Sequence, residues 1–234
     1  MKKKLLSLLC VMLLVVGAVF GTYAYLTAQD TVTNTFTVGK VGLNLDEAKT
    51  NEAGEVVKDD DENVVRTEDG NAYKLMPGHT YAKDPTVTVL AGSEESYVRM
   101  LVTFSYSSQL DAIFDPTPET NPSKANLTEI FKGYDGTKWE LFGVTEDADA
   151  NTRTYEFRYY DTVDTLDNAD KTLEALFTGF TLPENITKEQ LATLVTLDAE
   201  GKVESQFSIT VVAQAIQAMD FDDADDAWGH FPVA

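Results

Sequence analysis

The chain has almost no cysteine: Cys10 is the only one among its 234 residues. It lies in an uncharged apolar run, residues 5–20, that we expect to be removed as part of a signal peptide. The mature chain then has no thiol, which excludes disulfide bonds, a cysteine nucleophile and cysteine-ligated zinc. Stability outside the cell must therefore come from the packed core.

Histidine is nearly as scarce, with His79 and His230 as the two in the chain. A zinc peptidase of the common type needs H-E-x-x-H, which places two ligands one helical turn apart with a glutamate base between them. The two histidines are too far apart in sequence for this motif, and the G-x-S-x-G motif of serine hydrolases is missing as well. The sequence offers no catalytic residues and no cofactor-binding residues, so we expect a protein that is not an enzyme.

Basic residues are also few. The chain has 18 Lys and Arg and 39 Asp and Glu, which gives a formal net charge of −21. Such a surface repels nucleic acid and anionic lipid, so neither is an expected partner. Four acid-rich stretches offer the oxygen ligands that calcium prefers: residues 58–62, residues 146–151, the series Asp161, Asp164, Asp167 and Asp170, and residues 220–226. None matches an EF-hand loop, and acid runs are usually solvated faces. Calcium is therefore an open alternative, with no metal ligand assigned.

The first residues have the three parts of a secretory signal peptide. Three lysines precede the apolar run, and small residues follow it. Thr22 and Ala24 occupy the two small positions before the expected cut, which makes residues 1–24 the signal peptide. A cut after Ala28 is one alternative. An uncleaved membrane anchor is another, although the apolar run is slightly short for a membrane span.

Alternating apolar residues in the remaining chain, residues 25–234, predict β-strands. In residues 98–106 the apolar face is unbroken, which is typical of a core strand in an antiparallel sheet with one wet side. Further strand patterns cover residues 31–38, 41–45, 87–89, 138–144, 152–160 and 205–218. Strands at both ends, few helices and no strand–helix alternation predict a mainly β protein, a single antiparallel β-sandwich with short inserted helices.

An acidic insert, residues 46–72, interrupts the strand pattern. Two apolar pairs flank its most acidic stretch, at 56–57 and 64–65, and predict a protruding hairpin. A solvated, partly disordered loop is the alternative.

Three segments have helical character. Residues 168–180 look helical, as do residues 185–195, where Thr187 and Gln190 match a capping box. One helical turn with an aromatic anchor at Trp228 is expected near the C-terminus.

Four motifs in order carry a family resemblance: the end of the signal, "GTYAYLT", then "TVTNTFTVGKVGLNL", "MPGHTYAKDPTVTV" and "SYVRMLVTF". Together they resemble the TasA/camelysin (CalY) family of exported proteins, which a SipW-type signal peptidase of Gram-positive bacteria processes. The resemblance implies a jelly-roll-like β-sandwich that is secreted and built into biofilm matrix or cell-surface fibres. It barely touches the acidic insert or the middle of the chain.

In TasA-like fibres, the N-terminal segment of one subunit is donated as a strand to its neighbour. The resemblance therefore makes residues 25–38 a candidate donor strand, with Val32, Phe36 and Val38 as its self-assembly residues. These three share one parity, while threonines hold the other. From the residues alone, an edge strand of the chain's own domain is the alternative.

We therefore predict a secreted structural protein, located in the extracellular matrix or at the cell surface. Its expected partners are other copies of itself, the signal peptidase, and other matrix or cell-wall components. Because camelysins have been described as metallopeptidases, a secreted metallopeptidase is the alternative function. A chelator-sensitive protease assay separates the two.

Overall fold

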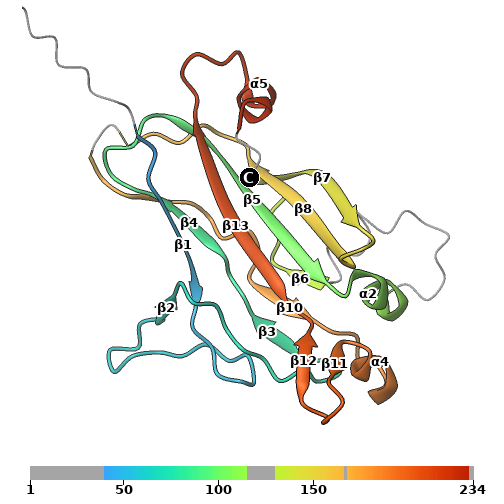
Figure 1. Cartoon of the computed structure of the whole chain (residues 1–234). Helices are drawn as coiled ribbons and strands as arrows, with labels where there is room; N and C mark the ends of the chain where they lie inside the picture. The colour runs from blue at the N-terminus through green and yellow to red at the C-terminus, as the bar shows by residue number, and fades with distance from the viewer. Residues whose placement is uncertain (1–39, 115–129, 166–167, 232–234) are drawn as a thin grey trace, which may run out of the picture. The chain divides into compact units, whose positions relative to one another are not determined.

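The computed structural model describes residues 40–114, 130–165 and 168–231 (Figure 1). The expected signal peptide with Thr22 and Ala24, and the candidate donor residues Val32, Phe36 and Val38, lie outside the described residues. Within the described ranges, no helix is long and apolar enough to cross a membrane.

One antiparallel sheet contains the strand with the unbroken apolar face. Its strands, in spatial order, are β13 (Ile209–Gln217), β5 (Ser96–Ser105), β8 (Thr152–Tyr159) and β7 (Trp139–Asp147). The period of two along β5 buries Val98, Met100, Val102 and Phe104, each at most 1% exposed. The residues between them are only half-buried on the other face. The prediction that residues 98–106 supply a core strand is confirmed.

Two groups of shorter strands face this sheet across the core, and a further, mostly exposed pair lies beside the start of β13 (Figure 1). One group is β2 (Arg66–Thr67), β1 (Leu43–Ala48), β4 (Thr86–Val89) and β9 (Lys171–Thr172); another is β3 (Thr80–Ala82), β10 (Gly179–Thr181) and β6 (Phe131–Lys132); the last is the pair β11 (Val195–Leu197) and β12 (Val203–Gln206). A single hydrophobic cluster, which includes Val87, Phe104, Phe157 and Phe180, fills the space between the layers. The mainly β, antiparallel, sandwich-like fold is therefore confirmed.

Three short helices are described: α2 (Ser107–Phe114), α4 (Lys188–Ala192) and α5 (Ala224–Gly229). Thr187 caps α4 through the reciprocal bonds with Gln190 that the sequence predicted. In α5, Trp228 is 6% exposed and lies 4.2 Å from the Arg99 guanidinium on the outer face of β5. The expected helical turn anchored by Trp228 is confirmed.

The helix predicted for residues 168–180 is wrong. Its apolar residues have helical spacing, but the backbone bonds go to neighbouring strands: Leu173 N donates to Val87 O, and Leu176 N donates to Pro85 O. The segment forms β9 and β10 with an irregular stretch between them. Tertiary hydrogen bonding thus overrides the local pattern.

Two boundaries also change. The strand expected over residues 205–218 is two strands, β12 and β13. Between them, Phe207 N donates its hydrogen bond to Leu194 O. Residues 46–48, taken as the start of the acidic insert, belong to β1. Beyond them, isolated bridges pair Thr50 with Val56 and Lys58 with Val64, as expected for a hairpin.

Candidate assembly groove

Two strand edges lie next to each other where the two layers meet. Among the described residues, β13 pairs on one side only, with β5, and the Leu43–Asp46 part of β1 pairs only with β4. Residues of β1 and β13 are in contact. An unpaired edge presents a row of N–H and C=O groups that can pair with another strand.

The inward-facing side chains at these edges are apolar but incompletely covered. They are Leu43 and Leu45 on β1, and Ile209, Val211, Ala213 and Ala215 on β13. All six pack against the core and remain partly exposed. Val102, the partner of Val211 on β5, is 0% exposed. The apolar side chains between β1 and β13 are therefore less well covered than those on the neighbouring strand β5.

A groove lies at one end of this seam, where β13 begins. It consists of two adjoining hollows of about 810 Å³ and 260 Å³, which share Asp69, Gly70, Lys83 and Ile209 in their linings. The larger hollow is lined by aromatic residues, including Phe180 and Phe207, and the smaller by Leu45 and Val211 on opposite walls. We call the two hollows together the assembly groove.

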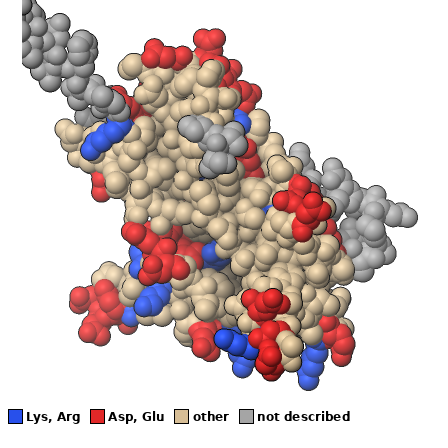
Figure 2. Space-filling model, in the orientation of Figure 1, with Lys and Arg blue, Asp and Glu red and all other residues tan. Residues whose placement is uncertain are grey.

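Charged side chains gather at one end of the groove. Figure 2 shows a largely uncharged face along β13, and acidic and basic groups around the hollow beside the acidic insert. There Arg66 binds Asp46 at 2.6 Å and Asp84 at 2.5 Å. These pairs fix β2 to β1 and to the start of β4.

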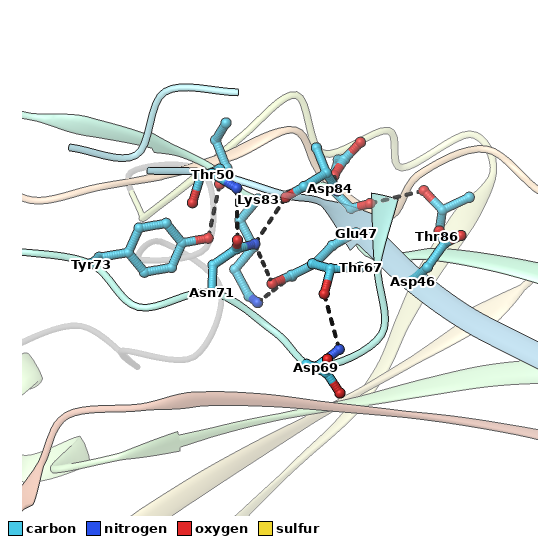
Figure 3. A network of polar contacts seen from close by, with 12 residues as sticks. Asp46, Glu47, Thr50, Thr67, Asp69, Asn71, Tyr73, Lys83, Asp84 and Thr86 are labelled. Atoms are coloured by element: carbon cyan, nitrogen blue, oxygen red, sulfur yellow. Dashed lines mark hydrogen bonds and ion pairs between the residues drawn. The ribbon is translucent and has the colours of Figure 1, made fainter. Parts of the chain in front are cut away.

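A second polar group is buried at the groove floor (Figure 3). Lys83 Nζ lies 2.6 Å from Glu47 Oε2, and both side chains are 8% exposed. Asn71 Nδ2 donates to Glu47 Oε1 at 2.8 Å. Burial, and secondarily the negative charge of Glu47, raise the pKa of Tyr73 from 10.0 to about 12. We call Glu47, Asn71, Tyr73 and Lys83 the polar cluster.

The two histidines lie in different parts of the fold. His79 is half-buried, bonds Ala53 O through Nε2, and packs edge-on against Tyr81. His230 follows α5, where its Nδ1 lies 2.9 Å from Asp226 O. β3 and α5 lie toward opposite ends of β13 (Figure 1), so the histidines do not form one site.

Carboxylates of the acid-rich stretches accept backbone hydrogen bonds in turns and at the start of a helix. Asp59 Oδ1 accepts bonds from Asp61 N and Asn63 N, and these bonds lower the pKa of Asp59. Asp170 accepts from Ala91 N, and Asp223 caps α5. Within residues 40–114, 130–165 and 168–231, no three His, Cys, Asp or Glu side chains are grouped so that they could hold a metal ion. Asp167 lies outside the described residues.

No protein-family model, curated protein or solved structure matches the chain.

Sequence reasoning missed both the groove and the polar cluster. The groove depends on which strand edges become neighbours, which no local pattern reports. The cluster had a signal: Glu47 continues the inward parity of Leu43 and Leu45, and Lys83 continues that of Tyr81. Opposite charges at inward positions indicate a buried ion pair, since a buried charge must be paired.

Proposed function

We propose that this protein is a secreted structural subunit that assembles into surface or matrix fibres by β-strand donation. The assembly groove is the acceptor, and residues 25–38 of another copy supply the donor strand. The observation that supports this is that β13 and the Leu43–Asp46 part of β1 each have an edge without a partner among the described residues, with partly exposed apolar side chains between them.

The donor matches the β13 edge in pattern and length. Val32, Phe36 and Val38 share one parity and meet the apolar walls, while the threonines of the other parity face solvent. Residues 31–38 span about 26 Å as a strand at roughly 3.3 Å per residue, close to the length of β13.

Association by this strand is energetically favourable. Each ladder hydrogen bond contributes about 0.5–1.5 kcal/mol net. Burying Phe36 and Val38 adds roughly 1.5–3 kcal/mol each. The translational and rotational entropy lost on association costs from about 4 kcal/mol upward. The summed free energy of several such bonds and two such side chains exceeds this lower value.

The first test compares a chain that begins at Tyr25 with one that begins at Lys40, by sedimentation and electron microscopy. We expect both to fold and only the longer chain to form fibres. Equal assembly by the shorter chain would refute strand donation. Failure of the shorter chain to fold would show that residues 31–38 complete their own domain.

A second test uses the chain that begins at Tyr25, which contains no cysteine. Thr35→Cys places a thiol on the solvent side of the donor, and Val212→Cys places one on the 45%-exposed outer face of β13. A mixture of the two single variants should form disulfide-linked dimers under mild oxidation. The double variant at high dilution should remain free of an internal disulfide. The reverse result would indicate that the strand pairs within its own chain.

A further inference from the structure

The polar cluster brings an amine, a carboxylate and a carboxamide together in one buried site. We propose that Lys83 and Asn71 become joined by an intramolecular isopeptide bond, with Glu47 as the residue that transfers the proton. This inference does not depend on strand donation.

The contacts place each group for this reaction (Figure 3). Glu47 bridges the reactants: one carboxylate oxygen is 2.6 Å from Lys83 Nζ and the other is 2.8 Å from Asn71 Nδ2. Thr50 N donates to Asn71 Oδ1 at 2.7 Å, which polarises the carbonyl that the amine attacks. Asn71 Nδ2 also donates to Ala48 O at 2.9 Å, so the carboxamide is fixed on both sides.

The reaction balances without an external reagent. Glu47 takes a proton from the Lys83 ammonium, and the neutral Nζ attacks Asn71 Cγ to form a C–N bond. Glu47 then gives the proton to Nδ2, the Cγ–Nδ2 bond breaks, and ammonia leaves. No electron is gained or lost, and the new amide nitrogen passes its extra proton to Glu47, so that the buried ion pair ends as a neutral amide and a neutral carboxylic acid.

The surroundings favour this reaction. Lys83 and Glu47 are each 6% exposed, and a buried charged pair carries a desolvation cost that the neutral amide product does not. The fold holds the Lys83 amine and the Asn71 carboxamide on the two oxygens of one carboxylate, which supplies the proximity that an amine and a carboxamide lack in free solution. The bond would close the loop from residue 71 to residue 83 and fix the end of the acidic insert to the start of β4.

The test is peptide mapping of the folded, purified wild-type protein by tandem mass spectrometry. Trypsin cleaves after Arg66, Lys74 and Arg99, and an acylated Lys83 is no longer cleaved. We therefore expect residues 67–74 linked to residues 75–99 in one branched peptide, lighter than the sum of the two by one ammonia.

Two variants assign the roles. Glu47→Gln should abolish the branched peptide, and Glu62→Gln is the matched control because Glu62 pairs with Lys58 at the surface. Asn71→Leu removes the carboxamide but keeps the Lys83–Glu47 pair, so it should also abolish the link. It serves as the test variant if Glu47→Gln does not fold.

Three results would overturn the proposal. One is a wild-type digest in which Lys83 is cleaved normally. A second is loss of ammonia from the 67–74 peptide alone, which indicates a succinimide at Asn71. The third is a branched peptide that persists in folded Glu47→Gln, which would remove Glu47 from the reaction.

Discussion

Val102 offers a direct test of the sandwich core. It lies at the middle of β5, 0% exposed, paired with Val211 on β13 and Tyr155 on β8. Val102→Asp would bury a carboxylate among apolar side chains without a partner. Val102→Ala would leave a cavity without adding charge.

The two substitutions differ in magnitude. Burying a polar or charged group without a partner costs several kcal/mol, a large part of the 5–15 kcal/mol that stabilises a typical domain. The alanine variant should lose about 2 kcal/mol. For a domain of this size, 1 kcal/mol shifts Tm by roughly 2–4 °C, so the alanine variant should melt about 4–8 °C lower.

The assay is thermal and urea unfolding followed by circular dichroism. Val212→Asp is the matched control, because the neighbouring position on β13 is 45% exposed on the outer face. We expect no cooperative transition for Val102→Asp and a near-normal one for the control. Wild-type melting of Val102→Asp would mean that β5 does not lie in the core.

Two further predictions concern ionisable groups. Arg153, which is 4% exposed, donates hydrogen bonds to both oxygens of Asp111 at 2.6 Å, so Asp111→Ala should cost about 3 kcal/mol in urea unfolding. Loss of the half-exposed Glu146 carboxylate should cost less than about 1 kcal/mol, and equal effects would contradict this ranking. Because the pKa of Tyr73 is raised to about 12, its contribution to stability is present below pH 10 and is lost as the pH rises from 10 to 12. The difference in tyrosinate absorbance between wild type and Tyr73→Phe should show a group titrating near pH 12, and a difference centred near pH 10 would refute the shift.

The fold class could be predicted because the strands of this chain have clear period-two patterns. In β5 one face is buried and the other is not, so the sequence alternates without interruption. β8 follows the same pattern as far as Phe157, after which Arg158 is also buried. The cap of α4 was equally predictable, since a capping box is a local interaction.

The predicted helix over residues 168–180 failed for a physical reason. Leu173, Leu176, Phe177 and Phe180 have helical spacing, and all are buried. Phe180 lies in β10, and the other three reach the core from the irregular stretch between β9 and β10, whose backbone N–H groups donate to β4, to the residue before it and to β6. Helical spacing alone does not distinguish a helix from a segment held on both sides by strands.

The groove and the polar cluster mark two limits of sequence reasoning. Neighbouring edges are set by pairings between distant segments, such as β5 with β13, and no local pattern encodes which edge remains open. The inward parity of Glu47 and Lys83, by contrast, was visible in the sequence. In a chain that has no cysteine pattern to indicate a covalent link, an inward-facing lysine opposite an inward-facing carboxylate, with an asparagine nearby, is the pattern to examine. This pattern indicates a reaction only because the fold also places Asn71 against the carboxylate of Glu47.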